Sequence, residues 1–319
     1  MKRKISVIIN SYNRLCLLKD GLPSLVQGLK EQNIDASVVV FDAGSTDGSV
    51  EYVQEVNRKV DTPIHILQPN EGENSSFAAG VNTAIEFAAE EYPELEWCLL
   101  YETDNYLKNP RAVGAAIDLL QRREDLGAVG FTVEQHNGAT VGYGESFPTV
   151  TSFVLGQQLS SLLGLHTPNP TWQTEAGHRF AYSEVVYTSP LLVRYECWED
   201  VGGMDQSAFP FTDSDIDLCW RLHKNGSRCA VLDTTGIVHD NREVDSEWSK
   251  ERVERFHRSR MKVILRHRDV RREVIQIFLL LRHMAEIPVL LFLSLIGARP
   301  LESVANRLKL LRGVFSCYD

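Results

Sequence analysis

The sequence lacks the features that would identify an exported or metal-ribbon protein. Its six cysteines are scattered, and no two have the C-x-x-C spacing of a zinc ribbon. The first residues, MKRKISVIIN, are basic, but they lead into neither an apolar run of useful length nor an A-x-A-like cleavage site. Several cysteines stand inside apolar runs, as buried free thiols do. We therefore expect a cytoplasmic protein in a reducing compartment, with the inner face of the membrane as an open alternative.

Positive charge is scarce in most of the chain. The 319 residues carry 33 Lys and Arg against 43 Asp and Glu, a net charge of −10. From residue 251 to the end the balance reverses, with 14 Lys and Arg against 7 Asp and Glu. The acidic body argues against nucleic acid as a partner, because that binding depends on basic patches. The uneven charge predicts that one end meets an anionic surface.

Long charge-free apolar runs are absent as well. The segment VIQIFLLLRHMAEIPVLLFLSLIG (274–297) is interrupted by Arg282, His283 and Glu286. A transmembrane helix needs about 20 predominantly apolar residues, so we do not expect one here. The preceding residues predict a basic helix. Two interpretations of 251–319 stay open, namely helices packed on the main domain and a peripheral membrane contact.

The chain does contain a regular alternation of strands and helices. Strands are predicted at 5–10, 36–42, 63–69, 96–104 and 126–135, and helices at 15–30, 49–60, 77–92 and 109–125. Continuous apolar strands that alternate with helices predict an α/β protein with a Rossmann-like, mostly parallel sheet covered on both faces.

We expect one domain over 1–250 and a helical C-terminal region over 251–319. The domain divides into a nucleotide-binding half, 1–135, and an acceptor half, 136–250. Residues 136–186 are rich in Gly, Ser, Thr and Pro. They predict a long loop or insert over the site, since loops of that length are usually functional.

Polar residues follow the first four strands, at the edge where open parallel sheets bind ligands. They are Asn10, Tyr12 and Arg14; Asp42; Asn70 and Gly72; and Glu102 with Asp104. Because the carboxyl ends of parallel strands share one edge, we expect these side chains to converge in one crevice.

Seven segments in order resemble glycosyltransferase family 2, whose members have the GT-A fold. They are SVIINSYNR, VVVFDAGSTDGS, NEG…FAAGVN, LLYETDNYLKNP, SPLLVRYECWEDVGGMD, PFTDSDIDLCWRLHKNG and IVHDN. The C-terminal LKLLRGVF is similar to the tails of rhamnosyltransferase-like members. The resemblance covers about residues 4–240 well and the tail loosely.

The resemblance implies an inverting transfer of a sugar from a nucleotide-sugar donor to a glycan or lipid-linked acceptor in surface polysaccharide or glycoconjugate synthesis. It implies that Asp104 and His239 hold a divalent cation, Mn²⁺ or Mg²⁺, which neutralises the leaving diphosphate. Glu102 takes the place of the first acid of the family's D-x-D, and we count it among the metal and nucleotide ligands. Asp215 matches the residue that takes the proton from the acceptor hydroxyl.

The nucleotide contacts implied by the resemblance are Asn10, Tyr12, Arg14, Asp42, Asn70, Gly72, Glu102 and Asp104. Tyr12 would stack on the base, and Arg14 would pair with phosphate or with Asp42. Four positions depart from the family pattern: Asn10 instead of Pro or Thr, Ala43 instead of Asp or Asn, Glu102 instead of Asp, and Ser214 instead of Glu. Trp172, in a Pro-rich segment, is the tryptophan we expect nearest an acceptor sugar, whereas Trp198 and Trp220 have the spacing of core residues.

Two alternatives remain. A nucleotidyltransferase on a related sheet would usually show a Gly-rich phosphate loop with a basic residue near the N-terminus, which SVIINSYNR lacks. A degenerate module that binds a nucleotide sugar or glycan without turnover is favoured by the substitutions at Glu102 and Ser214. The sequence does not indicate the oligomeric state.

Overall fold

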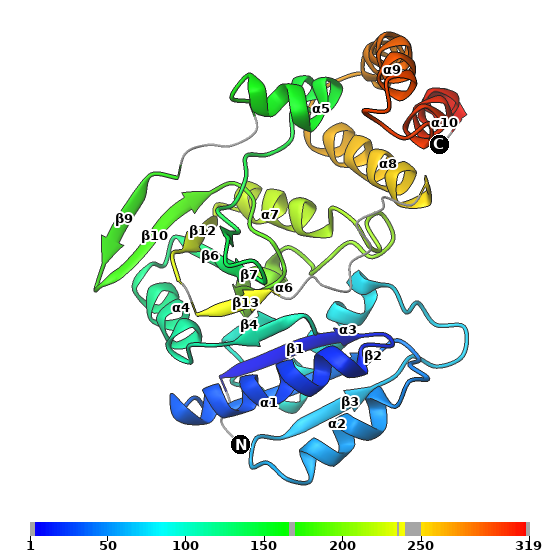
Figure 1. Cartoon of the computed structure of the whole chain (residues 1–319). Helices are drawn as coiled ribbons and strands as arrows, with labels where there is room; N and C mark the ends of the chain where they lie inside the picture. Colours follow the sequence, from blue (N-terminus) through cyan, green and yellow to red (C-terminus); the bar gives the residue numbers. More distant parts are fainter. Residues whose placement is uncertain (1–3, 166–169, 235, 240–249, 317–319) are drawn as a thin grey trace. The chain divides into compact units, whose positions relative to one another are not determined.

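The chain divides into two compact units in a computed structural model that describes residues 4–165, 170–234, 236–239 and 250–316. Unit 1 comprises Met1–Glu145 and Asn169–Val244, and unit 2 comprises Ser146–Pro168 and Asp245–Asp319. Residues 146–168 therefore group with the C-terminal region, and not with the acceptor half in which we had placed them (Figure 1). We describe each unit by itself.

Unit 1 is built on a nine-stranded mixed sheet. Its strand order is β3 (Ile64–Leu67), β2 (Ala36–Asp42), β1 (Ile5–Ser11), β4 (Trp97–Leu100), β11 (Leu191–Arg194), β6 (Leu126–Phe131), β12 (Arg228–Leu232), β10 (His178–Ser183) and β9 (Trp172–Glu175). The first four are parallel, as predicted. The predicted fifth strand, β6, does not pair with β4, because β11 lies antiparallel between them. The α/β prediction with a mostly parallel sheet is confirmed.

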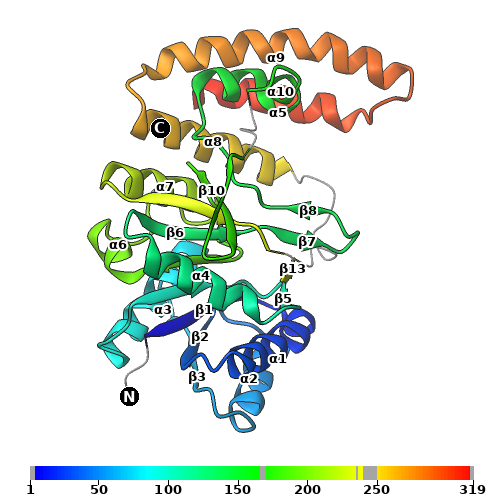
Figure 2. The ribbon, with the colours of Figure 1, turned by 90° about the vertical axis from the view of Figure 1, so that its left-hand side faces the viewer.

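Helices cover both faces of this sheet (Figure 1 and Figure 2). One face buries apolar side chains of β1, β2, β4, β6 and β11 against α1 (Leu15–Glu31), α2 (Ser49–Asn57) and α4 (Arg111–Arg122). The other face is covered in part by α3 (Phe77–Glu91), which contacts β1 and β2. Helix α3 comes close to Phe41 at Gly80. A Cβ at this position would lie 2.5 Å from the Phe41 ring, so the close approach requires glycine.

A second, four-stranded sheet lies beyond the predicted fifth strand. Its order is β5 (Asn105–Leu107), β13 (Ile237–His239), β7 (Val133–Gln135) and β8 (Thr140–Val141). The predicted strand 126–135 breaks at Thr132, whose hydroxyl donates to the Thr234 carbonyl at 2.6 Å. This sheet pairs His239 with Asn105 and so brings a late histidine beside the acidic turn that follows β4.

The predicted loop or insert over 136–186 contains regular elements that the sequence did not indicate. Residues Val150–Leu162 form α5, and β9 and β10 form a hairpin at the edge of the large sheet. The hairpin turns at Ala176 and Gly177, which both have positive φ, as a tight two-residue turn requires. The abundance of Gly, Ser and Thr concealed helical and strand patterns that tertiary packing completes.

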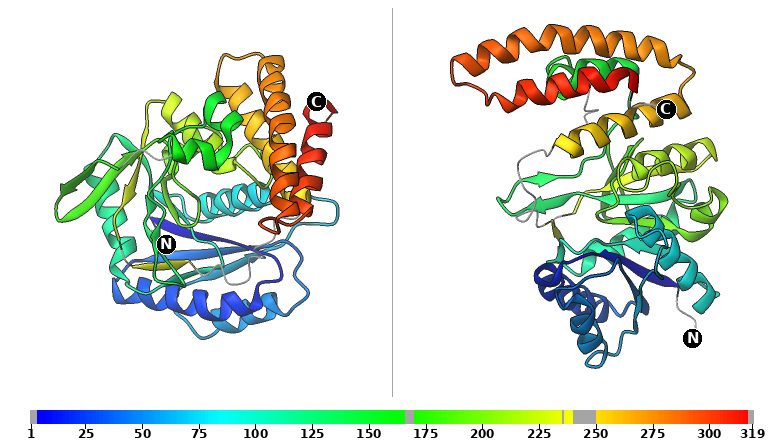
Figure 3. Two further views of the ribbon diagram at one scale, coloured as in Figure 1. Left: turned by 45° about the horizontal axis from the view of Figure 1, so that its top comes forward. Right: turned by 90° about the vertical axis from the view of Figure 1, so that its right-hand side faces the viewer.

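Unit 2 is helical. It contains α5, α8 (Lys250–His267), α9 (Arg272–Leu295) and α10 (Glu302–Ser316), and α9 contacts both α5 and α10 (Figure 3). Its small core contains Phe153, Met261, Ile264, Ile275 and Leu279. Among the described residues, α9 is the helix long and apolar enough to cross a membrane by length and composition, and only 11% of its apolar window is buried. Length and composition therefore permit a span that the interrupting charges had led us not to expect.

Two short helices complete unit 1. They are α6 (Tyr195–Asp200), directly after β11, and α7 (Ser214–Lys224), which leads into β12. Trp198 and Trp220 are buried at 5% and 6% exposure, as expected of core residues. The first turn of α7 contributes Asp215 to the candidate site.

Candidate active site

The carboxyl ends of the first four strands lie at one edge of the sheet. Ser11 pairs with Asp42 and Phe41 with Leu67, so β1, β2 and β3 end at nearly the same level, and β4 ends earlier, opposite Ile8 of β1. Polar segments follow all four strands. The parallel register thus places these segments at one edge of the sheet, where open parallel sheets bind ligands.

Three carboxylates act on one another at this edge. Burial, together with the negative charges of Asp104 and Asp215, raises the pKa of Glu102 to about 8. The Thr188 hydroxyl donates to Glu102 Oε1 at 3.4 Å and opposes this shift only weakly. Two acids from the turn after β4 and one from α7 thus share a region where negative charge is poorly compensated.

Asp104 has a histidine beside it. Its Oδ1 atom lies 3.5 Å from Nδ1 of His239, and the Ser189 hydroxyl lies 3.5 Å from each of these atoms. Burial raises the pKa of Asp104, while the charges of His239 and Arg14 lower it. An acid and an imidazole nitrogen in this arrangement form a pair that suits a divalent cation with mixed oxygen and nitrogen ligands.

Asn105 holds this pair in place. Its side-chain amide donates to the Ser189 hydroxyl at 2.8 Å, and its Oδ1 lies 3.3 Å from His239 Nδ1. Asn105 is 1% exposed, so these bonds satisfy polar atoms that have left water. Asn105 and Ser189 were not among the residues predicted for the site. Asn105 directly follows the E-T-D turn, and Ser189 stands in the S-P dipeptide before β11; these positions were the available signal.

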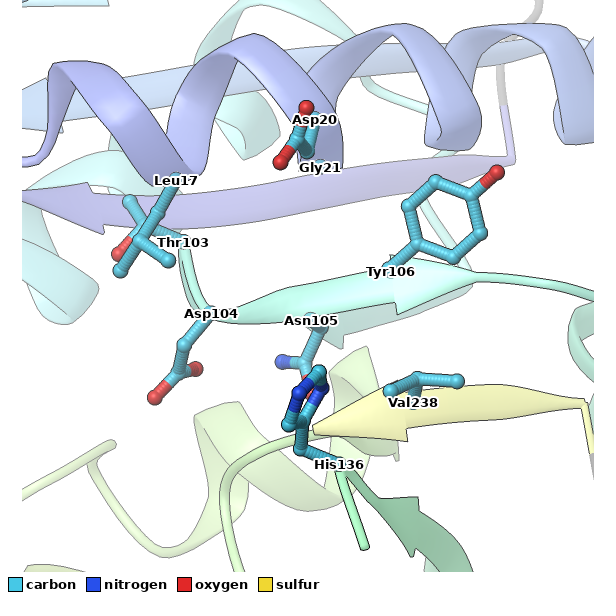
Figure 4. Close-up of a pocket in the computed structure, with 9 residues that line it drawn as sticks. All are labelled: Leu17, Asp20, Gly21, Thr103, Asp104, Asn105, Tyr106, His136 and Val238. Carbon is cyan, nitrogen blue, oxygen red and sulfur yellow. The ribbon is translucent and has the colours of Figure 1, made fainter. Parts of the chain in front are cut away.

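Helix α1 approaches the acidic turn at Gly21. A Cβ at this position would lie 2.7 Å from the Asn105 carbonyl oxygen and 3.2 Å from that of Thr103. The helix and the turn enclose a cavity of about 210 Å³ (Figure 4). It is lined by Leu17, Asp20, Gly21, Thr103, Asp104, Asn105, Tyr106, His136 and Val238. Gly21 therefore sets the distance between α1 and the segment that carries Asp104.

Asp215 lies in the first turn of α7, at the positive end of the helix dipole. Its Oδ1 accepts from the Ile216 N–H at 2.9 Å. The next acid of the motif has another task, because buried Asp217 pairs with Arg221 at 2.7 Å, and Arg221 donates to the Val201 carbonyl. Asp217 thus fixes α7 to the Gly-Gly turn after α6.

Two of the predicted nucleotide ligands hold loops together. Asp42 is 1% exposed, and its carboxylate accepts from the Gly44 N–H and from the N–H and hydroxyl of Ser45. The Asn10 amide donates to the Phe77 carbonyl at 3.0 Å and connects β1 to the start of α3. Both side chains shape the crevice edge through these bonds.

The other predicted nucleotide ligands lie in exposed loops. Tyr12 is 58% exposed, and Arg14 is exposed at the start of α1, where its charge acts on both Glu102 and Asp104. The amide of Asn70 donates to Glu73, and Gly72 has a φ of 85° in the same loop. Arg14, Glu102, Asp104, Asp215 and His239 are thus brought together. Tyr12 is exposed in the loop before α1, and Asn70 and Gly72 lie in the loop after β3.

Trp172 is on a strand and not in the predicted loop. It belongs to edge strand β9, where the Arg179 guanidinium lies 4.8 Å from the ring centroid. Tyr143 meets the ring edge to face at 6.3 Å. The ring is half-buried, and part of it stays accessible to a ligand.

Solved structures share this fold. A comparison with S. aureus TarS (residues 1–349) in complex with UDP-GlcNAc gives a TM-score of 0.54 at 17% identity, over 98% of this chain and 81% of that one. The mannosyltransferase PcManGT from Pyrobaculum calidifontis, in complex with GDP-Man and Mn²⁺, gives 0.54 at 14% identity over 100% and 82%. The expected GT-A fold is thereby confirmed.

Sequence comparisons agree. A pre-mycofactocin glycosyltransferase of Mycobacterium tuberculosis is 30% identical over 104 residues, which cover 32% of this chain and 22% of that protein. An uncharacterised glycosyltransferase of a Nostoc strain is 34% identical over 82 residues, 25% of this chain and 24% of that one. The chain thus spans about a quarter of these relatives' lengths. The sequence model described as glycosyltransferase-like family 2 matches residues 3–268, and this chain belongs to that family.

Proposed function

We propose that this protein transfers a sugar from a nucleotide-sugar donor to a hydroxyl group of a glycan or lipid-linked acceptor, with inversion at the anomeric carbon. The observation that carries the proposal is the convergence of Glu102, Asp104 and Asp215 at the ligand-binding edge of the sheet. Family membership and nucleotide-sugar complexes of proteins with the same fold support the reaction class.

Asp215 is the proposed base. An inverting transfer is one displacement, so it needs a carboxylate that takes the proton from the attacking hydroxyl and no second carboxylate as a nucleophile. The first turn of α7 places Asp215 at the positive end of the helix dipole and beside Glu102. The new bond forms between the acceptor oxygen and the anomeric carbon, and the nucleoside diphosphate leaves.

A divalent cation fits the acidic cluster. Burial raises the pKa of both Glu102 and Asp104, and the neighbouring negative charges raise that of Glu102 further, so a bound cation would favour the ionised form of both acids. Asp104 and His239 would hold Mn²⁺ or Mg²⁺, with Glu102 as a further oxygen ligand. When bound, the cation would neutralise negative charge on the diphosphate as it leaves. No group of three such ligands is preassembled in the described residues, so the donor's phosphates would complete the coordination.

We assign donor binding to the half of the site formed by residues 1–135. Tyr12 offers an exposed ring for stacking on the base, and Arg14 places a guanidinium beside the acids. Asp42 and Asn10 support these loops, while Asn70 and Gly72 form part of the rim. Hexosyl or rhamnosyl donors are the proposed class, the latter because the C-terminal sequence is similar to rhamnosyltransferase-like tails.

We assign acceptor binding to the part of unit 1 that follows residue 135. Trp172 on β9 offers a half-buried ring face of the kind that stacks on sugars. An acceptor in surface polysaccharide or glycoconjugate synthesis would present its hydroxyl to Asp215. We also propose a reducing, cytoplasmic location, with which the free cysteines of the described residues are compatible.

A binding module without turnover is the second candidate. It is favoured by Ser214, which is 3% exposed where the family has an acid, and by Glu102, whose pKa of about 8 differs from that of an ordinary acid. Such a module would bind a donor but release no nucleoside diphosphate.

The test is a panel of nucleotide sugars assayed with Mn²⁺, with Mg²⁺ and with a chelator, in the presence of glycan and lipid-linked acceptors. We expect nucleoside diphosphate release that depends on the cation and on one donor. Nuclear magnetic resonance of the product would report the anomeric configuration. Binding of a donor, detected as a thermal shift, without product from any acceptor would favour the module.

A further inference from the structure

Helix α9 presents an apolar stripe to the outside of unit 2. Its exposed members share one face of the helix, because at about 3.6 residues per turn they all fall within one half of its circumference. They are Val274, Ile277, Phe278, Leu281, Met284, Val289, Leu291, Phe292 and Leu295. Phe278 and Phe292 are 49% and 61% exposed, and Leu295 is 84% exposed. A stripe of this length on the surface of a soluble bundle would normally be polar.

The charged residues in the middle of α9 face the opposite way. Arg282 pairs with Glu286 at 2.9 Å and donates to the Phe153 carbonyl of α5. Arg307 of α10 reaches Glu286 at 2.7 Å and lies 3.1 Å from Nδ1 of His283, which is 0% exposed. Polar groups therefore join the helices inside unit 2, and the apolar side chains remain outside.

Basic residues bracket the stripe. Arg271 and Arg272 are exposed where α9 begins, and Arg299 is exposed just beyond its end. Lys262 and Arg268 add exposed positive charge in and after α8. An apolar stripe between arginines is the pattern that binds the surface of an anionic bilayer, because the arginines reach the headgroups while the stripe enters the acyl region.

We propose that the outward face of α9 docks on an anionic lipid bilayer, with the helix in the plane of the interface. A crossing orientation is disfavoured because α10 contacts α9 and would bring Glu302, Lys309 and Arg312 into the hydrocarbon. In the plane of the interface, only the stripe needs to be buried. A second copy of the chain is a less suitable occupant of this stripe, because the arginines at the ends of the two stripes would repel one another. The proposal rests on unit 2 alone and is independent of the proposed reaction.

The test is flotation of the full chain with phosphatidylcholine vesicles that contain or lack phosphatidylglycerol. We expect the protein to float with the anionic vesicles and to be released by high salt or alkaline carbonate. The double variant Phe278→Glu/Phe292→Glu should remain unbound, because both charges would enter the acyl region. The matched control, Gln54→Glu/Gln121→Glu, adds the same charge on exposed positions of unit 1 and should bind as the wild type does.

A triple variant tests the electrostatic part. Neutralising Arg271, Arg272 and Arg299 to Gln should weaken binding to anionic vesicles roughly a hundredfold, about fivefold for each arginine. Both α9 variants should keep full activity on a water-soluble acceptor, which separates this proposal from the reaction. The proposal is overturned if the wild-type protein binds no vesicle or resists carbonate extraction. It is also overturned if the Phe278→Glu/Phe292→Glu variant still floats, or if the only change in this variant is a loss of self-association.

Discussion

The Oδ1 atom of Asp104 lies 3.5 Å from Nδ1 of His239, although the two residues belong to segments far apart in the sequence. The pairing of His239 with Asn105, between β13 and β5, brings them together. The Ser189 hydroxyl, from a third segment, and the Asn105 amide fix the arrangement. A cation site built in this way depends on the tertiary fold as well as on its two ligands.

Replacing Asp104 by Asn should therefore abolish cation-dependent turnover. The neutral amide keeps the shape of the side chain but removes the charge that holds the metal, and we expect an activity loss of at least about a hundredfold. Isothermal titration with Mn²⁺ and a nucleoside diphosphate would show the matching loss of affinity. The variant Asp200→Asn, at an exposed position of α6, is the control. Mn²⁺-stimulated activity that survives in Asp104→Asn would contradict this assignment.

Glu102 should make the metal-free protein less stable as pH rises. Its pKa is about 8 in the folded state against an ordinary 4.5, so between these values the folded state holds a proton that the unfolded state releases. The free energy of unfolding therefore falls from about pH 4.5 to about pH 8. Glu102→Gln should remove this slope and stabilise the protein by roughly 1–3 kcal/mol above pH 8.

Urea unfolding at a series of pH values, without added metal, measures this effect. Glu124→Gln, at an exposed position, makes the same chemical change and should leave the slope as it is. Equal slopes in the wild type and in Glu102→Gln would show that Glu102 is ionised throughout this range. The Glu102→Asp variant would then test the departure from the family pattern directly, through its cation-dependent rate.

Gly21→Ala should disturb the site from the opposite side of the acidic turn. The new methyl group would lie 2.7 Å from the Asn105 carbonyl, so α1 or the turn must move. We expect a loss of about 1–3 kcal/mol in stability and a fall in the metal-dependent rate. Gly114→Ala is the matched control. Gly114 lies inside α4, and the nearest neighbour of a Cβ there would be the Gln32 side chain, at 3.5 Å. That substitution should stabilise by about 0.5–1 kcal/mol. An unchanged rate in Gly21→Ala would show that the turn tolerates the shift.

Unit 2 should lose stability in mild acid. Burial, followed by the charges of neighbouring arginines, lowers the pKa of His257 and His283 to about 3 from an ordinary 6.5. As pH falls from about 6.5 towards 3, the two histidines are protonated in the unfolded state before they are in the folded state. The free energy of unfolding therefore decreases. Hydrogen exchange of α9 amides, corrected for intrinsic rates, should show lower protection at about pH 5 than at about pH 7. His283→Gln should reduce that difference, and equal protection at both pH values would contradict the prediction.

The sequence was informative where structure is local. The apolar runs and helical periodicities of residues 5–122 predicted β1 to β4 and the helices between them to within a few residues, because propensity and burial pattern agree there. It was uninformative where pairing is non-local. Nothing in residues 191–194 indicates that β11 enters the sheet antiparallel between β4 and β6, since neighbours in a sheet are chosen by tertiary packing.

The same distinction applies to the site. Asp104, His239 and Asp215 could be predicted because they stand in ordered motifs, and the structure brings them to one edge of the sheet. Asn105 and Ser189 could not, because small polar residues are common in turns and acquire their function only through contacts between distant segments. The roles of all these residues stay predictions until they are tested by substitution.

The most direct test of the central claim is the release of nucleoside diphosphate by the wild type and by Asp215→Asn, with the active donor, cation and acceptor. Our account predicts that the variant binds the donor normally but turns over about 10² to 10⁴ times more slowly, because the acceptor hydroxyl has lost its base. The Asp200→Asn control should match the wild type. An Asp215→Asn enzyme that releases product at the wild-type rate would contradict the account.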